Sequence, residues 1–172
     1  AYARQLIEIQ TPQFKPGADG QLVPDVRAGA AIIYNPATQQ VLYESNAQTP
    51  RSIASITKVM TAVAFLENEV DATREVTIHP DDLRGASTTY LRRNDRVSIQ
   101  QLLHLLLIGS DNVAARTLAR ASLYGPLGFV ERMNQKAAEL GLTQTRYYDP
   151  SGLYAENISS AFDMARLISF AA

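Results

Sequence analysis

The sequence contains no cysteine, few lysines and no long apolar segment. Without cysteine, disulfides, thiolate catalysis and cysteine-ligated metals are excluded. The longest apolar run, Leu102 to Ile108, is interrupted by His104 and is far too short to cross a bilayer. The first residues, Ala1 to Gln10, are too polar for the apolar part of a signal peptide. A secretion leader has therefore been removed or never existed.

A strong excess of either charge is also missing. The 172 residues carry a formal net charge of −1, so the surface offers little to a phosphate backbone and nucleic-acid binding is not expected. With 46% hydrophobic and 19% charged residues, the composition is that of a globular domain, and the length fits one domain. Most cations are arginines, and Lys58 is unusual because it stands in an apolar stretch.

The chain begins with an irregular stretch and continues with β-rich and then helical patterns. Residues 1–27 lack periodicity and predict an extended N-terminal arm, whereas 29–34 and 40–44 flank a turn sequence and predict a β-hairpin. From 54 to 67 apolar residues recur at helical spacing around most of the circumference, which predicts a buried helix. A short strand is expected at 75–78 and a polar loop at 85–94. Helical patterns with capping and stop signals predict helices at about 98–108, 112–122, 126–140 and 160–172.

The predicted hairpin needs partners that the chain does not offer. A two-stranded ribbon is marginal in water because its apolar faces require more strands or a helix against them. No later segment has the pattern of a strand able to complete the sheet. The sequence therefore predicts an incomplete sheet.

The first chemical motif is Ser55-Ile56-Thr57-Lys58, at the start of the buried helix. Residues three apart lie on one helical face, so the Ser55 hydroxyl and the Lys58 amine can meet. An apolar setting lowers the pKa of a lysine, and the uncharged amine can then act as a base for the hydroxyl. The spacing alone fits an N-cap serine and an ordinary helix lysine equally well.

The second motif, Ser110-Asp111-Asn112, begins another predicted helix. Serine, aspartate and asparagine are the preferred N-cap residues, so a purely structural role would explain the tripeptide. The two motifs in this order carry more weight than either alone. S-x-x-K followed by S-D-N marks penicillin-binding proteins and class A β-lactamases.

The residues around both motifs resemble low-molecular-mass penicillin-binding proteins, the family of D-alanyl-D-alanine carboxypeptidases and endopeptidases. The similar segments are Arg51 to Ala62, Met133-Asn134, Ala138 to Leu142, Asp149 to Leu153 and Asn157 to Leu167. The resemblance covers residues 28–172 and is nearest to the penicillin-binding protein 7 type endopeptidases. It implies an α+β fold of the β-lactamase/transpeptidase type, with an antiparallel sheet packed against a helical subdomain. It also divides the chain into an N-terminal extension, 1–27, and a partial transpeptidase-like domain, 28–172.

The resemblance further implies a serine peptidase that cleaves D-Ala-D-Ala bonds in peptidoglycan peptides without a cofactor. Ser55 would attack the carbonyl and become acylated, and Lys58 would take its proton. Ser110 would pass a proton to the leaving amine, and Asn112 would hold the Lys58 side chain and a substrate amide. Ser55, Ser110 and Asn112 would thus contact the substrate, with the Ser55 N–H as half of an oxyanion hole. Asp111 occupies a variable position in the family, and we assign it the helix cap.

The resemblance also implies where the protein works and what inhibits it. β-Lactam antibiotics would acylate the same serine. The protein would act in the periplasm or elsewhere outside the cytoplasm, associated with the cell wall or peripherally with the membrane.

One element of the family's site is missing from the sequence. The third motif, Lys-Thr-Gly, lies on a strand at the other side of the site, yet no lysine follows Lys136 here. The same strand supplies the second oxyanion donor, and the loss of one donor costs about 100- to 1000-fold in rate. The sequence therefore predicts a C-terminally truncated domain that is nearly inactive alone.

The two histidines do not indicate a metal site. His79, followed by Pro80, Asp81 and Asp82, has metal-type neighbours, but a single histidine beside a turn proline predicts a loose surface segment. His104 lies within an apolar helix and is expected to be a core or interface residue. No metal ligand is assigned.

Three alternative interpretations remain open from the residues. A class A β-lactamase would need a glutamate placed for deacylation after the Asn112 helix, whereas Glu131 and Glu139 both fall within a helical pattern. A catalytically inactive peptidoglycan-binding module would explain the missing third motif, but the intact Ser55–Lys58 pair opposes it. A helical domain with coincidental caps would leave the extended similarity unexplained.

Overall fold

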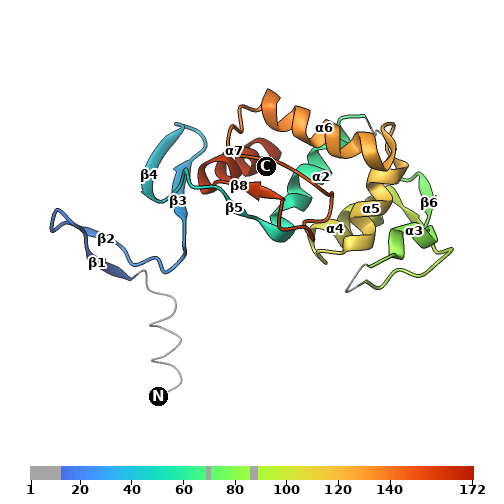
Figure 1. Cartoon of the computed structure of the whole chain (residues 1–172), viewed down its shortest axis with the longest axis horizontal. Helices are drawn as coiled ribbons and strands as arrows, with labels where there is room; N and C mark the ends of the chain where they lie inside the picture. The colour runs from blue at the N-terminus through green and yellow to red at the C-terminus, as the bar shows by residue number, and fades with distance from the viewer. Residues whose placement is uncertain (1–12, 69–70, 86–88) are drawn as a thin grey trace, which may run out of the picture. The chain divides into compact units, whose positions relative to one another are not determined.

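The computed structural model describes residues 13–68, 71–85 and 89–172 (Figure 1). These residues fall into two compact units, a first unit up to Ala47 and a second unit from Gln48 to Ala172. Residues 1–12 of the predicted arm and 86–88 of the predicted polar loop lie outside the described residues. The two units are described separately below.

The described part of the first unit begins with a hairpin that the sequence did not predict. β1 (Phe14–Pro16) pairs antiparallel with β2 (Leu22–Pro24), where an irregular arm was expected. The turn between them is stabilised locally, because the Asp19 carboxylate accepts the Gln21 N–H at 3.0 Å. The prediction was wrong because these strands are only three residues long and show no alternating pattern.

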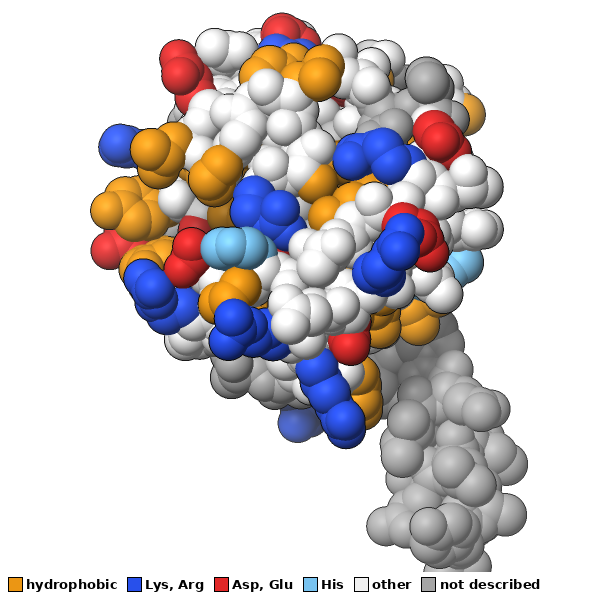
Figure 2. Space-filling model, turned by 90° about the vertical axis from the view of Figure 1, so that its right-hand side faces the viewer, with side chains coloured by type: hydrophobic (Ala, Val, Ile, Leu, Met, Phe, Trp, Pro, Cys, Tyr) orange, Lys and Arg blue, Asp and Glu red, His pale blue; other side chains and the backbone are white. Residues whose placement is uncertain are grey.

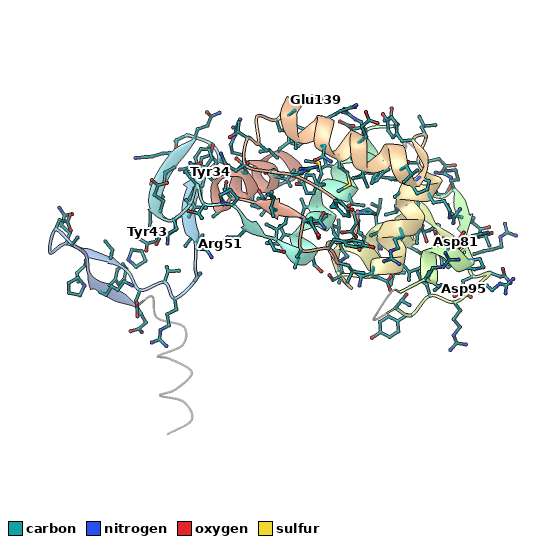
Figure 3. The ribbon with its side chains drawn as sticks, in the orientation of Figure 1. Tyr34, Tyr43, Arg51, Asp81, Asp95 and Glu139 are labelled. Atoms are coloured by element: carbon teal, nitrogen blue, oxygen red, sulfur yellow. The ribbon has the colours of Figure 1, made fainter. Side chains whose placement is uncertain are left out.

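The second hairpin of this unit confirms the prediction. β3 (Ala31–Asn35) pairs antiparallel with β4 (Gln40–Ser45). The Asn35 side-chain oxygen accepts the N–H groups of Ala37 and Thr38 at 3.0 and 3.3 Å, so one asparagine sets the turn. Among the described residues β3 pairs with β4 alone, as expected for an incomplete sheet. Tyr34 of β3 and Tyr43 of β4 are labelled in Figure 3.

The second unit is mainly helical and is built around α2 (Thr57–Leu66). This helix packs against four others: α4 (Ile99–Leu107), α5 (Asn112–Ala121), α6 (Gly125–Glu139) and α7 (Ala161–Ala171). Met60 and Phe65 of α2 are almost fully buried, and so are Leu118 of α5 and Leu167 of α7. The prediction of a buried helix with apolar residues on most sides is therefore confirmed.

Side-chain caps fix where these helices begin. The Ser98 hydroxyl accepts the Gln101 N–H, and the Gln101 side chain accepts the Ser98 N–H, which confirms the capping box at α4. Ser160 also caps α7 by accepting the Asp163 N–H at 3.1 Å. The reciprocal half of that second box is absent, because the Asp163 carboxylate accepts the Gln144 N–H instead. That carboxylate joins α7 to the preceding loop.

Two short ladders complete the second unit. β5 (Arg51–Ser52) pairs with β8 (Ile158–Ser159), and the predicted strand β6 (Glu75–Thr77) pairs with β7 (Arg96–Ser98). Neither β7 nor β8 was predicted from the sequence. The β5–β8 ladder matters for the site, because it joins the segment before Ser55 to the end of a loop that lies against it.

The segment after β6 lies at the surface, as expected around His79, but it forms a capped helix and not a loose stretch. His79 caps the short helix α3 (Pro80–Leu83), and its N–H donates to the Asp82 carboxylate at 2.9 Å. Asp82 is buried and also accepts hydrogen bonds from Arg120 of α5 at 2.8–3.1 Å. Asp81, on the same helix, is exposed (Figure 3).

Cationic and acidic side chains are interspersed on the face of this unit near α3 and β6 (Figure 2). Arg84 lies 3.0 Å from Asp81, and Arg96 lies 2.5 Å from Glu75. All four side chains are at least half exposed to solvent. Such surface pairs contribute little to stability.

Candidate active site

Ser55 lies exposed on a tight turn where α2 begins. The residues Ala54–Ile56 form a 3-10 turn, η1, that leads directly into α2, so the predicted single helix from 54 to 67 starts with a tighter segment. Side chains three residues apart eclipse one another in 3-10 geometry, so this tighter segment keeps the Ser55 side chain on the helical face that carries Lys58. Ala54 has a φ of 45°, a left-handed conformation that is costly for an alanine.

Lys58 is buried and contacts Ser55. Its side-chain nitrogen Nζ lies 3.0 Å from Ser55 Oγ and donates a second hydrogen bond to the Ser151 carbonyl oxygen at 2.7 Å, while only 2% of the residue is exposed. Burial lowers the pKa of Lys58 below its ordinary value of 10.5, and the charges of Asp149 and Asp111 act in the opposite direction. The pair thus combines an accessible hydroxyl with an amine that loses its proton more readily than a surface lysine.

The Ser151 carbonyl belongs to a loop that side chains of other elements hold in place. Thr61 of α2 donates to the Pro150 carbonyl oxygen at 2.7 Å. Asn134 of α6 donates to the Tyr147 carbonyl oxygen and accepts the Tyr147 N–H, both at 2.9 Å. The loop is therefore attached to the same helix that carries Lys58 and to its neighbour α6.

Gly152 lets this loop lie directly against the Ser55 turn. A Cβ atom at position 152 would be 1.9 Å from the Ala54 carbonyl oxygen and 3.1 Å from the Ser55 nitrogen. Gly152 also has a φ of 81°, which disfavours other residues. Both the space and the backbone conformation therefore require glycine here.

The second motif lies at the start of α5. Ser110 is exposed, with a φ of 52°, and Asn112 is the buried first residue of the helix. Asp111 caps α5, since its carboxylate accepts the N–H groups of Val113 and Ala114 at 2.8 and 2.9 Å, which confirms the cap role predicted for it. Asp111 also raises the pKa of Lys58 through its charge, so this turn lies within electrostatic reach of the amine. The structure thus joins Ser55 to Lys58 directly and places Ser110 and Asn112 on a neighbouring turn.

Sequence reasoning assigned no role to the carboxylate of Asp149. It accepts the Ser151 N–H at 2.9 Å and a short hydrogen bond from the Ser151 hydroxyl. Asn157, which is fully buried, donates to it at 2.5 Å and accepts the Tyr148 N–H at 2.9 Å. The turn sequence Asp-Pro-Ser-Gly was a signal for local hydrogen bonding, but the bond to Asn157 could not be read from it.

Neither histidine takes part in this arrangement. His79 caps α3, and His104 is exposed on α4. Of the two positions expected for His104, the core position is therefore wrong and the interface position stays a prediction. Within residues 13–68, 71–85 and 89–172 no group of three or more His, Asp or Glu side chains could hold a metal ion. In the same ranges, no helix has both the length and the apolar character needed to span a membrane.

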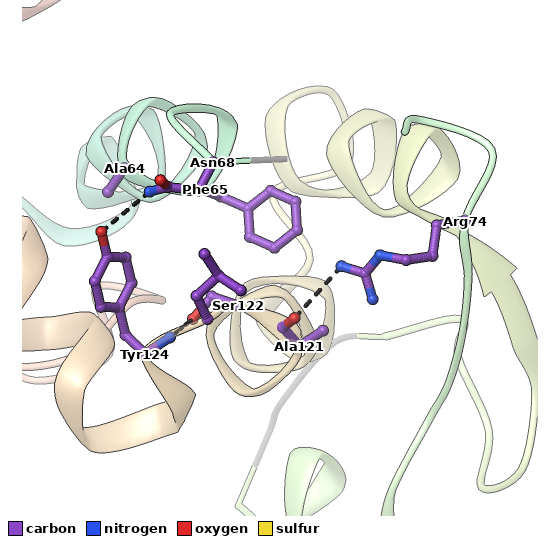
Figure 4. Close-up of a pocket in the computed structure, with 8 residues that line it drawn as sticks. Ala64, Phe65, Asn68, Arg74, Ala121, Ser122 and Tyr124 are labelled. Atoms are coloured by element: carbon purple, nitrogen blue, oxygen red, sulfur yellow. Dashed lines mark hydrogen bonds between the residues drawn. The ribbon is translucent and has the colours of Figure 1, made fainter. Parts of the chain in front are cut away.

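A separate cavity of about 320 Å³ lies at the other end of α2 (Figure 4). Its walls include Phe65 and Asn68, and Asn68 donates to the Tyr124 hydroxyl at 3.0 Å. Arg74 approaches the Ala121 carbonyl oxygen at 3.4 Å at the end of α5. Because α2 has ten residues, its two ends are about 15 Å apart. This cavity is therefore distinct from the Ser55–Lys58 pair.

Comparison with known proteins identifies the family. A family profile described as D-alanyl-D-alanine carboxypeptidase matches residues 17–171. A D-alanyl-D-alanine endopeptidase of Haemophilus influenzae is 36% identical over 83% of this chain and 50% of its own length. The chain spans about half the length of the curated relatives it matches.

Solved structures agree in fold. The crystal structure of a D-alanyl-D-alanine carboxypeptidase from Mycobacterium tuberculosis has a TM-score of 0.81 and 31% identity, covering 91% of this chain and 60% of that one. Penicillin-binding protein D2 from Listeria monocytogenes, solved in the cefotaxime-bound form, has a TM-score of 0.74 and 31% identity, with 84% and 61% covered. The predicted α+β transpeptidase-like fold is therefore confirmed.

Proposed function

Since this chain belongs to the D-alanyl-D-alanine carboxypeptidase family, we propose that it carries the acylation machinery of a serine peptidase acting on peptidoglycan stem peptides. In this proposal Ser55 is the nucleophile, Lys58 is its base, and Ser110 and Asn112 assist. The observation that carries it is the 3.0 Å contact between Ser55 Oγ and Lys58 Nζ, in which the hydroxyl is exposed and the amine is buried.

Acylation follows from this contact. Uncharged Lys58 accepts the proton of Ser55 Oγ as that oxygen attacks the carbonyl carbon between two D-alanines. The tetrahedral intermediate collapses when the C–N bond breaks, and the proton held on Lys58 reaches the departing amine through the Ser110 hydroxyl. A water molecule then attacks the ester on Ser55, with Lys58 as base again, and releases the shortened peptide and free serine. Each proton taken is returned, so no cofactor is consumed.

To stabilise the oxyanion, the chain has only one of the two hydrogen-bond donors that the proposed mechanism needs. The N–H of Ser55 is one donor in the proposed mechanism, and no Lys-Thr-Gly strand occurs in the sequence to supply another. Without the second donor we expect the 172-residue chain to react about 100- to 1000-fold more slowly than a protein that has both. Tests of activity therefore belong on the full-length protein that contains this sequence.

The substrate and the place of action are part of the same proposal. The family and its penicillin-binding relatives support peptidoglycan peptides as substrates and β-lactams as acylating inhibitors. Action outside the cytoplasm, with cell-wall or peripheral membrane association, follows from the proposed substrate. The proposal includes both cleavage of a terminal bond, as by a carboxypeptidase, and cleavage of a bond within a cross-link, as by an endopeptidase.

The two alternative activities predict different results with β-lactams. A class A β-lactamase would hydrolyse a chromogenic cephalosporin rapidly, which requires a deacylating glutamate. Glu139 is instead held by Arg132 at 2.6 Å on the surface of α6, and Glu131 is exposed on the same helix. An inactive binding module would form no adduct at all.

The test is to incubate the full-length protein with a fluorescent penicillin and to locate the adduct by mass spectrometry. We expect a long-lived adduct on Ser55. Ser55→Ala should abolish it, and Lys58→Arg should slow its formation by about 100- to 10,000-fold because a guanidinium stays charged and cannot act as base. Ser52→Ala, at an exposed position three residues earlier, is the matched control and should label normally. Absence of label on Ser55 in the wild type would exclude the proposal.

A further inference from the structure

The Asp149 carboxylate is saturated by hydrogen bonds from its own loop. Besides both bonds from Ser151 and the one from Asn157, it accepts the N–H groups of Gly152 and Tyr154 at 3.2 and 3.4 Å. Asp149 is 7% exposed. Burial alone would raise the pKa of this carboxyl, but the hydrogen bonds from Ser151 and Asn157 outweigh burial and lower it. The group is thus ionised and has no free position for a substrate.

These bonds determine where the Ser151 carbonyl points. The main-chain N–H and the hydroxyl of Ser151 both donate to one oxygen of Asp149, so the residue is fixed on two sides. Its carbonyl oxygen then accepts from Lys58 Nζ at 2.7 Å. Since Lys58 Nζ is also 3.0 Å from Ser55 Oγ, a continuous chain of contacts leads from Asp149 to the nucleophile.

Asp149 also acts on the amine through its charge. Two carboxylates, Asp149 on this loop and Asp111 at the cap of α5, raise the pKa of Lys58 against the larger effect of burial. The Asp149 effect differs from that of a purely structural residue, because removing its charge changes the protonation of Lys58 as well as the position of the loop.

We propose that Asp149 is a positioning residue for acylation, which holds the Ser151 carbonyl against the Lys58 amine and thereby directs that amine at Ser55 Oγ. This inference rests on the proposed function and adds to it a residue that contacts neither substrate nor nucleophile. Replacing the carboxylate by an amide keeps the size but leaves one acceptor atom in place of two, so bonds on one side of the group are lost.

The experiment measures the rate of Ser55 labelling by a fluorescent penicillin against pH in the full-length protein. For Asp149→Asn we expect two changes. The maximal rate should fall by about 10- to 100-fold, because small displacements of a catalytic group are costly. The acid limb of the pH–rate profile, where the rate falls as Lys58 becomes protonated, should move to lower pH. The loss of a nearby negative charge makes Lys58 easier to deprotonate. Asp149→Glu keeps the charge but not the geometry, so it should lower the rate and leave the limb in place.

Asp163→Asn is the matched control. Asp163 is also buried and accepts the Gln144 N–H at 2.8 Å, but it is not among the charges acting on Lys58. It should lower the melting temperature without moving the limb. If Asp149→Asn does not fold, Ser151→Ala removes one donor and should still slow labelling severalfold with the limb unmoved.

The outcomes separate the two proposals. No Ser55 adduct in the wild type would refute the proposed function itself. An adduct in the wild type, together with an unchanged rate in Asp149→Asn or a limb that stays in place, would overturn the role of Asp149 alone. The same holds if Asp163→Asn shifts the limb equally, or if Ser151→Ala labels at the wild-type rate.

Discussion

At the scale of single residues, the burial of Lys58 lowers the stability of the folded protein while it makes the uncharged amine, which acts as the base, easier to form. Because burial lowers its pKa in the folded protein, the folded state binds fewer protons at this group than the unfolded chain does. The resulting loss of stability is fully present below the folded pKa and disappears as the pH rises towards 10.5. The hydrogen bonds to Ser55 and Ser151 offset part of this cost.

Gly152 gives a direct test of the contact between the loop and the serine turn. Gly152→Ala would place a methyl group 1.9 Å from the Ala54 carbonyl oxygen, so one backbone segment must move. We expect penicillin labelling of Ser55 to slow by about 100-fold and the free energy of unfolding to fall by at least about 1–2 kcal/mol. Labelling kinetics and urea titration measure the two effects.

Gly125 provides the control for that substitution. It also has a positive φ, 63°, but nothing lies within 4 Å of an added Cβ. Gly125→Ala should therefore reduce stability by about 1 kcal/mol and leave labelling unchanged. Equal labelling rates in both variants would mean that the loop does not hold the serine turn.

The sequence predicted the contact between Ser55 and Lys58 but not the contacts that support it. The first contact followed from a spacing of three on a helix, a local relation that the chain itself determines. The Asp149–Asn157 bond joins residues eight positions apart across a loop. The Ser151–Lys58 bond joins residues that are 93 positions apart in the sequence. No local pattern specifies either contact, because both depend on how the helices pack.

At the scale of elements, the ion pair between Asp82 and Arg120 holds α3 and α5 together. The Asp82 side chain is 4% exposed and that of Arg120 is 31% exposed. Arg120→Ala would leave a buried carboxylate without its cation, so we expect a loss of about 3 kcal/mol, towards the lower end for buried pairs because Arg120 is partly solvated. Urea denaturation measures it.

Arg84 is the comparison for this pair. Its side chain is 83% exposed and pairs with Asp81 of α3. Arg84→Ala should change the free energy of unfolding by less than about 1 kcal/mol. Similar losses in the two variants would show that burial of Asp82 does not set the energy of its contact.

Elements with strong local signals were predicted, and those without were missed. The starts of α4 and α5 followed from Ser98 and Asp111, whose side chains bond to backbone groups two or three residues on. β7 and β8 have three and two residues, too few to show alternation. Such strands exist because a partner strand lies beside them, which is a tertiary property.

At the scale of the whole molecule, the apolar core of the second unit explains its stability. All buried members of this core fall between Ile53 and Leu167. A variant that begins at Gln48 should therefore keep a cooperative thermal transition followed by circular dichroism. A variant that ends at Ser160 loses the core residues Met164 and Leu167. Each such loss costs about 2–5 kcal/mol, so this chain should not unfold cooperatively. A cooperative transition in the second variant would contradict this view of the core.

Family membership was predictable from the sequence because it rests on many positions at once. The order of the two motifs and the segments around them led to the fold that the solved relatives share. The boundary expected at residue 27 was drawn from loss of similarity, whereas compactness places the division at Ala47. The two criteria measure different things, so the boundary at residue 27 stays a prediction.

The scarcity of lysine has a practical consequence for chemical labelling. Lys15 lies 3.3 Å from Asp25 with half of its side chain exposed, whereas Lys136 is 14% exposed and pairs with Glu67. Of the three lysines in this sequence, an amine-reactive dye at mildly alkaline pH should thus attach mainly to Lys15. Slow modification of Lys58, prevented when a penicillin is bound to Ser55, would report how accessible the buried amine is from a single peptide in a tryptic digest.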